Sequence, residues 1–166
     1  PGAVHIESTS FASNYGTSGQ AVDLEIDHDG DDTAWLSDLD LRGALVDGGA
    51  IATLYASGNI ALRDISVSGD ATYTSLELTD GAHLRGATVT ASTSTRALMV
   101  NSGAEAHEVV ISGVDAGYAV RAVSGVLSDI QVLNSRASYG MYLTGDDILA
   151  TNIEVRNVQG SYAMKV

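Results

Sequence analysis

The chain of 166 residues contains no cysteine, one proline, and few aromatic residues, which make up 5% of the sequence. The absence of cysteine excludes disulfide bonds, thiolate metal sites and a cysteine nucleophile. Lysine and arginine number 8 against 21 acidic residues, giving a net charge of −13. A nucleic-acid partner is therefore not expected, because phosphates bind to basic surfaces. Membrane insertion is not expected either, because no apolar run of the sequence is long enough to span a bilayer.

Small apolar residues dominate what is present. Hydrophobic residues make up 45% of the chain, most of them Ala, Val, Leu and Ile, and they are accompanied by 18 glycines. A chain with this apolar content can bury a core despite its charge, and its length is that of one ordinary domain. The combination of small apolar residues, frequent glycine and almost no proline favours a repetitive β architecture.

Two short patterns alternate along the chain. The first, apolar-x-x-apolar-x-apolar, occupies residues 36–41, 62–67, 84–89, 106–111, 127–132 and 150–155. The second, two apolar residues one position apart, is formed by Leu54 with Ala56, Leu76 with Leu78, Leu98 with Val100, Val120 with Ala122, Met141 with Leu143, and Met164 with Val166. The two patterns remain in phase over five consecutive turns, which indicates a structural repeat.

A spacing of two places alternate side chains on one face of a strand. A strand–turn–strand–turn unit of about 22 residues cannot bury its apolar positions alone, whereas stacked copies bury them in continuous columns. We therefore predict an all-β fold, a single-stranded parallel β-helix (solenoid) of roughly six to seven coils, each advancing about 4.8 Å. The spacing of two and the glycine density exclude a helical repeat, and the Asn-anchored consensus of leucine-rich repeats is missing.

The two ends of the chain fit the repeat differently. Residues 1–23 are predicted to form an N-terminal strand and loop leading into the coil, and residues 24–166 the β-helix repeats, with inserts near 27–32 and 43–49. The chain stops inside a strand with no covering segment. Since an unpaired edge promotes association, we expect either that the chain belongs to a longer solenoid or that it self-associates end to end or through this edge.

Two turns carry a family resemblance. The segments 130–134 (Ile-Gln-Val-Leu-Asn) and 153–157 (Ile-Glu-Val-Arg-Asn) resemble the I-x-V-x-N unit of right-handed parallel β-helix, pectate-lyase-like proteins. The resemblance implies a right-handed coil and a ladder of asparagines that bond to the turn backbone. The equivalent positions in the earlier turns are Gly43, Gly69, Ala91 and Gly113. Glycine suits such a tight turn because it tolerates positive φ. The fold hosts lyases, hydrolases, phage tailspikes and inert adhesin stalks, so the resemblance specifies no activity.

The chain contains few of the catalytic motifs found in enzymes of the family that it resembles. Pectinolytic hydrolases of the family combine Asn-Thr-Asp, Gly-Asp-Asp, Gly-His-Gly and Arg-x-Lys motifs, and only Gly145-Asp146-Asp147 is similar to one of them. No histidine follows it, and the single proline at position 1 excludes the Asp-Pro-His-Glu motif of mannuronan epimerases. We predict no catalytic site. Asp146 and Asp147 are the candidates if one exists, and a solvated turn is the alternative.

Two acidic features are candidates for metal binding. The segment 27–32 brings Asp27, Asp29, Asp31 and Asp32 around Gly30, and several oxygen donors on one tight loop suit Ca²⁺. The alternative is an ordinary acidic surface loop, and the sequence requires no other cofactor. A second feature is a column of residues one turn apart, namely Asp38, Asp64, Gly86, Glu108, Asp129 and Asn152. We interpret it as a solvated acidic face, with decoration by divalent cations as the alternative.

Tyrosines also recur one turn apart. Tyr118, Tyr139 and Tyr162 occupy one position of three successive turns, and Arg121 and Tyr142 follow three positions later in their turns. An outward column could form a ligand-binding platform on which sugar rings stack. Inward stacking at the corner is the alternative, because in a regular strand Tyr118 lies on the same face as Val120, which belongs to the second apolar pattern.

These features predict a non-catalytic β-helix domain of an exported or surface protein, located outside the cell or on its surface. Such a domain would act as an adhesin, stalk or filament-like element with a glycan or surface polymer as partner. Two alternatives remain open. The chain could be a fragment of a polysaccharide-active lyase or hydrolase or of a phage tailspike, or it could be a carbohydrate-binding module that uses the tyrosine ladder.

Overall fold

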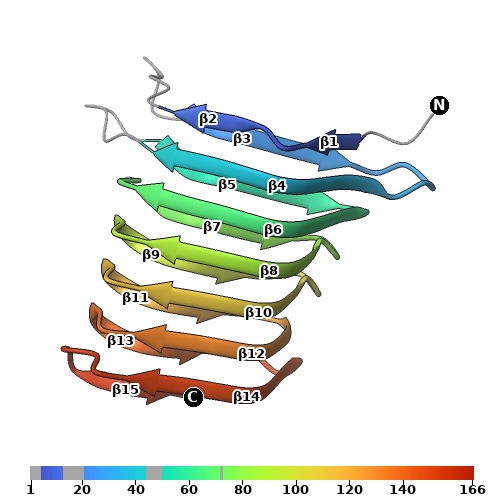
Figure 1. Ribbon diagram of the computed structural model, residues 1–166. Coiled ribbons are helices and arrows are strands. Elements are labelled where there is room, and N and C mark those ends of the chain that lie inside the picture. The colour runs from blue at the N-terminus through green and yellow to red at the C-terminus, as the bar shows by residue number, and fades with distance from the viewer. Residues whose placement is uncertain (1–4, 13–20, 44–49, 72) are drawn as a thin grey trace.

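The computed structural model describes residues 5–12, 21–43, 50–71 and 73–166, and these form a β-solenoid of about six turns (Figure 1). All of its regular elements in these ranges are strands. The strands are β1 (His5–Glu7), β2 (Ser10–Ala12), β3 (Ala21–His28), β4 (Ala34–Gly43), β5 (Ala50–Gly58), β6 (Ile60–Gly69), β7 (Thr74–Thr79), β8 (His83–Thr90), β9 (Thr93–Val100), β10 (Glu105–Ser112), β11 (Asp115–Ala122), β12 (Gly125–Leu133), β13 (Arg136–Leu143), β14 (Ile148–Arg156) and β15 (Tyr162–Lys165).

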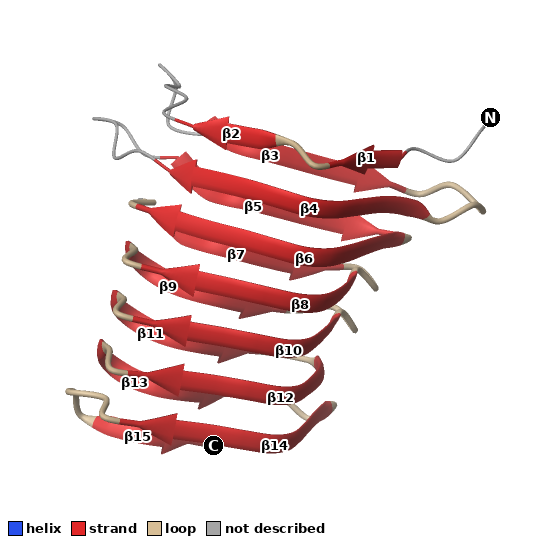
Figure 2. Cartoon of the chain, in the orientation of Figure 1, coloured by secondary structure: helices blue, strands red, loops and turns tan. Residues whose placement is uncertain are grey.

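The strands form two parallel sheets that face each other (Figure 2). Sheet A contains β1, β4, β6, β8, β10, β12 and β14, with β2 also paired to β4. Sheet B contains β3, β5, β7, β9, β11, β13 and β15. Each strand pairs with the equivalent strand of the next coil, so that Leu76 is the register partner of Leu98, and Leu98 that of Val120. The predicted parallel β-helix with a repeat of about 22 residues is therefore confirmed.

The two apolar patterns supply the core between the sheets. Sheet A contributes three inward residues per coil, such as Leu62, Ile65 and Val67, each at most 2% exposed. Sheet B contributes pairs such as Leu76 and Leu78, which are fully buried. A fully buried aliphatic side chain stabilises a fold by about 1.5–3 kcal/mol. The stacked columns therefore provide the main driving force that holds the coils together.

A bend in every long strand of sheet A explains why the first pattern contains a step of three. The central residue of each strand has φ between 51° and 74°. These residues are Asp38, Asp64, Gly86, Glu108, Asp129 and Asn152. One left-handed residue turns the chain and shifts the in–out alternation by one position, which separates the inward residues on either side by three. Asp, Asn and Gly tolerate this conformation best. The column therefore allows the strands to bend, in addition to forming an acidic face exposed to solvent.

Side chains along this bend column interact between coils. Arg85 donates to Glu108 through Nε at 3.2 Å and Nη2 at 2.9 Å, and the side-chain amide of Asn152 donates to Asp129. At Gly86 an added Cβ would lie 2.7 Å from Oδ1 of Asp64. Gly86 thus separates Asp64 from Glu108, and Arg85 and Asn152 each offer a hydrogen-bond partner to one carboxylate of the column.

The second corner contains the predicted column of asparagine and glycine. Gly69, Ala91, Gly113, Asn134 and Asn157 have φ between 45° and 80°. The amide of Asn157 donates to Oδ1 of Asn134 at 3.0 Å. In these two coils the ladder therefore runs from side chain to side chain along the axis.

The ends of the solenoid follow the predicted strands in part. β1 and β2 both pair with β4, so the N-terminal segment joins sheet A. Residues 44–49, which include most of the second predicted insert, lie outside the described residues. β15 is the predicted terminal strand, and Val166 behind it is 90% exposed. No helix with the length and hydrophobicity of a membrane span is found in the described ranges.

The left-handed bend makes a testable prediction at Asp38, whose φ is 54°. Asp38→Val should reduce the free energy of unfolding by about 1–2 kcal/mol, because a β-branched residue is strained in this conformation. Asp38→Gly should not destabilise, and Ser37→Val, one position earlier in the strand, is the matched control. Urea denaturation measures all three. Equal effects of valine at positions 37 and 38 would contradict the bend.

Candidate functional site

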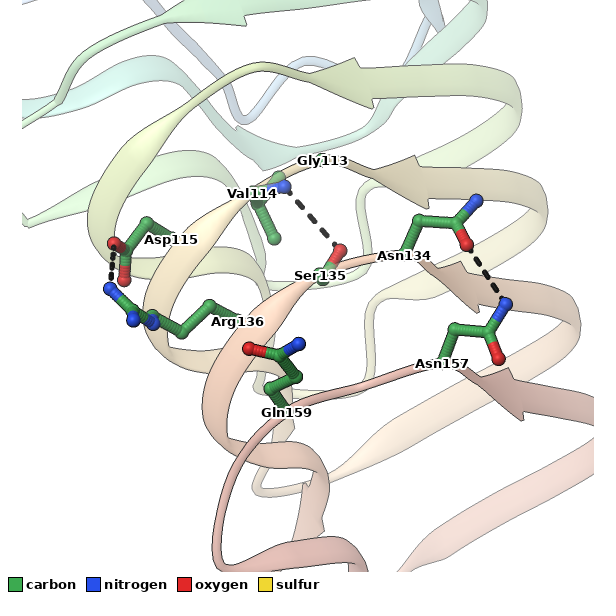
Figure 3. A pocket seen from close by; sticks show the side chains of 8 residues that line it. All are labelled: Gly113, Val114, Asp115, Asn134, Ser135, Arg136, Asn157 and Gln159. Atoms are coloured by element: carbon green, nitrogen blue, oxygen red, sulfur yellow. Dashed lines mark hydrogen bonds and ion pairs between the residues drawn. The ribbon is translucent and has the colours of Figure 1, made fainter.

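A polar groove lies where the chain passes from sheet A to sheet B in the C-terminal coils (Figure 3). Its volume is about 490 Å³. The residues that line it are Gly113, Val114, Asp115, Asn134, Ser135, Arg136, Asn157 and Gln159. Equivalent turns of three successive coils contribute these residues, so the groove runs along the solenoid axis. We call it the corner groove.

Hydrogen bonds within one coil and between neighbouring coils hold the corner groove in shape. The Ser135 hydroxyl donates to the Leu133 carbonyl at 2.8 Å and accepts from the Val114 N–H at 3.4 Å. Arg136 Nη1 lies 3.7 Å from Asp115 Oδ2, and both side chains are exposed. The groove therefore offers amide, hydroxyl, guanidinium and carboxylate groups, which are the groups that bind polyols.

The tyrosine ladder begins three residues beyond the groove in the same three coils. Tyr118 and Tyr139 have ring centroids 5.1 Å apart and planes inclined by 9°. Tyr139 and Tyr162 are 5.3 Å apart and inclined by 7°. Asp115, Arg136 and Gln159 each precede one of these tyrosines by three residues, so the corner groove and the ladder follow each other along the same three coils.

The ladder lies on the outside of sheet B. Tyr118 and Tyr139 are only half-buried, and their rings lie 5.4 and 5.0 Å from that of Tyr142, an outward residue between two buried ones. Strict alternation predicts that Tyr118 points inward. This prediction is wrong, because Ala119 and Val120 are both fully buried. Two consecutive inward residues interrupt the alternation and direct the preceding tyrosine outward.

Cations complete this surface. The Cζ of Arg121 lies 5.7 Å from the ring centroid of Tyr118. The Nζ of Lys165 lies 5.3 Å from the centroid of Tyr142, and it is within 6 Å of two further rings. Such contacts between a cation and an aromatic ring are attractive. We call Tyr118, Tyr139, Tyr142, Tyr162, Arg121 and Lys165 the tyrosine–cation surface.

The cations of this surface differ from most others in the chain. Among the described residues, Arg42, Arg85, Arg136 and Arg156 each have a carboxylate within 4 Å. No such ion pair in the described ranges involves Arg121 or Lys165, whose contacts are with tyrosine rings. In a protein of net charge −13, these residues mark a place where an external anion can bind.

The stacking geometry limits how sugars can use the ladder. Rings that are nearly parallel and about 5 Å apart cover each other's faces. The faces between Tyr118, Tyr139 and Tyr162 are therefore unavailable to a sugar ring. The ladder presents ring edges and hydroxyls, so ligand binding has to use these together with the cations.

The aspartates of the predicted calcium loop are all exposed. Hydrogen bonds from Asn59 and His28 hold the loop in shape. The Asn59 amide donates to the carbonyls of Gly30 and Asp31, each at 3.2 Å, and His28 Nε2 lies 2.6 Å from the Asp32 carbonyl. No three acidic or histidine side chains of the described chain are grouped so as to hold a metal ion. Ca²⁺ binding at Asp27, Asp29, Asp31 and Asp32 stays a prediction without support from this arrangement.

Asp146 and Asp147 lie at the other corner of the solenoid. They line a groove of about 560 Å³, together with Ser102, Gly103, Ser124, Gly125, Val126, Ile148 and Leu149. We call it the Asp146 groove. Both aspartates are exposed, and the lining contains no lysine, arginine or histidine that could act as a base.

One acidic–histidine network was not found from the sequence. On the outer face of sheet A, Oε2 of Glu105 lies 3.0 Å from Nδ1 of His83 and 3.2 Å from Nε2 of His107. The hydrogen bond from His107 is the main cause of a lowered pKa of Glu105; His83 contributes, and partial burial opposes it. Glu105 and His83 are register partners 22 residues apart, so comparing outward residues one turn apart could have revealed the pair.

The lowered pKa of Glu105 predicts a pH-dependent contribution to stability. The ionised carboxylate is favoured in the folded state, so the contribution is present above the unfolded pKa of about 4.3 and is lost as the pH falls through the lower folded value. The difference in unfolding free energy between wild type and Glu105→Gln should therefore shrink below that pH. Urea denaturation across the acidic range measures it.

The matched control combines His83→Gln with His107→Gln. In this background Glu105→Gln should have a much smaller effect, because the hydrogen bonds that lower the pKa are gone. A difference between wild type and Glu105→Gln that is the same at every pH would contradict the assignment.

Comparison of the chain with protein-family models, curated proteins and solved structures finds no match.

Proposed function

We propose that this chain is a β-solenoid domain of an exported or surface protein, and that it binds an acidic glycan along its C-terminal coils without cleaving it. The observation that carries the proposal is that the polar corner groove and the tyrosine–cation surface belong to the same three C-terminal coils. The solenoid supplies a stiff scaffold of the kind used in stalks and adhesins.

The chemistry of the surface favours a glycan that carries carboxylates or sulfates. Arg121 and Lys165 provide positive charge without a neighbouring carboxylate partner, while the rest of a chain with net charge −13 repels anions. The side chains of the corner groove can exchange hydrogen bonds with sugar hydroxyls. Binding is therefore directed to one surface.

The repeat also suits a linear polymer. Register partners bring equivalent side chains of neighbouring coils together, as Tyr118, Tyr139 and Tyr162 show. Coils are separated by about 4.8 Å, which is close to the length of one pyranose residue in an extended chain. A glycan lying along the axis would therefore meet one set of groove and tyrosine contacts per sugar.

The proposal is for binding without glycosidic cleavage. The Asp146 groove contains two carboxylates but no basic side chain in its lining. Cleavage by a pair of carboxyl groups requires one of them to be held protonated by its surroundings, and both aspartates are exposed to solvent.

Isothermal titration with oligogalacturonate and with a neutral oligosaccharide of equal length tests the proposal. The acidic ligand should bind more tightly, and added salt should weaken its binding. Arg121→Gln combined with Lys165→Gln should weaken it about tenfold or more. Arg42→Gln combined with Arg63→Gln is the matched control, since it removes two charges from sheet A.

The proposal fails if neither ligand binds, if both bind equally, or if the control pair weakens binding as much as the pair on sheet B. Thermal unfolding of each variant establishes that the fold is retained.

A further inference from the structure

A chain of hydrogen bonds joins four polar side chains across three coils on the outer face of sheet A. The Ser128 hydroxyl lies 2.6 Å from Nδ1 of His107, and Nε2 of the same ring lies 3.2 Å from Oε2 of Glu105. Oε2 of Glu105 also forms a hydrogen bond with Nδ1 of His83, at 3.0 Å. This order of groups, hydroxyl to imidazole to carboxylate, is that of an activated serine.

The carboxylate determines the direction of these hydrogen bonds. Ionised Glu105 can only accept, so His107 donates through Nε2. In the neutral ring Nδ1 then carries no proton and accepts from the Ser128 hydroxyl. In this tautomer Nδ1 of the neutral imidazole can take the serine proton.

The register of sheet A places a second hydroxyl beside Ser128. His107, Ser128 and Thr151 are successive register partners in β10, β12 and β14. Ser128 thus has the imidazole in the coil before it and the Thr151 hydroxyl in the coil after it. Thr151 is exposed, and the His107 side chain is 31% exposed. A substrate can approach all three, and Thr151 can donate to a developing oxyanion.

A place for an acyl group adjoins these residues. Val126 precedes Ser128 by two positions on the same face of β12, and its register partner in the next coil is Leu149, which is 57% exposed. Both line the Asp146 groove of about 560 Å³. An exposed apolar side chain beside a groove and a hydroxyl suits a short hydrocarbon chain linked to a polar group.

We propose that Ser128 is the nucleophile of an acyl-transfer site that hydrolyses carboxylic esters with short acyl chains. Ser128 Oγ forms a bond to the ester carbonyl carbon while its proton moves to His107 Nδ1. The carbon–oxygen bond to the alcohol then breaks, and the alcohol leaves with that proton. Water attacks the acyl-serine in the same way, releasing the carboxylic acid and restoring the hydroxyl. Glu105 acts as a positioning residue that keeps the His107 proton on Nε2.

This site is independent of the proposed glycan surface. It uses the outer face of sheet A, whereas the tyrosine–cation surface lies on sheet B. Either one can fail without affecting the other.

Reaction with a fluorophosphonate probe, followed by peptide mass spectrometry, tests the nucleophile, and hydrolysis of p-nitrophenyl butyrate tests the turnover. The probe should label Ser128. Ser128→Ala should abolish labelling and reduce hydrolysis to the rate in buffer. His107→Gln and Thr151→Val should each lower kcat about 100-fold. Glu105→Gln should lower kcat while leaving KM unchanged, which a merely structural effect would not do.

The matched control is Ser37→Ala. Ser37 occupies the same column, but its register partners are Glu7 and Arg63 rather than a histidine, so this variant should keep full activity. The proposal is overturned if wild type is neither labelled nor active above buffer. It is equally overturned if the label is found on another residue, if Ser128→Ala stays active, or if the control loses as much activity as Ser128→Ala.

Discussion

The parallel pairing of each strand with the equivalent strand of the next coil is the interaction on which the other features depend. The backbone hydrogen bonds of this pairing hold residues 21 to 30 positions apart in register, as for His107 with Ser128 and Leu24 with Leu54. Apolar residues at inward positions then stack into continuous columns that exclude water. Neither part is sufficient alone, because a single coil buries too little surface and unregistered strands would not align their inward side chains.

The same register turns a linear sequence into columns of like residues on the outside, where stacking has different consequences for different side chains. Carboxylates on neighbouring strands, about 4.8 Å apart, repel one another, and here Arg85 and Asn152 each donate to one of them while Gly86 interrupts the column. Tyrosines attract one another and form a ladder whose faces are covered. Where unlike polar groups meet, as His107 and Ser128 do, hydrogen bonds arise that no short sequence motif would indicate. The two proposed sites are thus products of the repeat, and they differ because they lie on opposite sheets.

The sequence predicts the solenoid well because burial imposes a strict period on the inward residues. It also predicts that Asn134 and Asn157 stack, because both follow the same strand position, but the hydrogen bond found joins the two side chains instead of a side chain and the turn backbone. It predicts the bend at Asp129 less directly, since the step of three between Leu127 and Ile130 records a shift in alternation but not the left-handed conformation that causes it. The outward direction of the tyrosines could not be derived from strict alternation, because Ala119 and Val120 both point inward. Pairing across coils, as between Glu105 and His83, requires the register to be known before the residues can be matched.

Disulfide trapping in this cysteine-free chain tests the coil register most directly. Thr88 and Val110 are register partners on the outer face of sheet A, and Val110 is in turn the partner of Gln131. Neighbouring strands are about 4.8 Å apart, within the Cα separation that a disulfide accepts, whereas two coils span roughly twice that distance. The pair Thr88→Cys with Val110→Cys should oxidise almost completely to an intramolecular disulfide, and the pair Thr88→Cys with Gln131→Cys should not. Failure of the first pair, or equal oxidation of both, would contradict the stacked register.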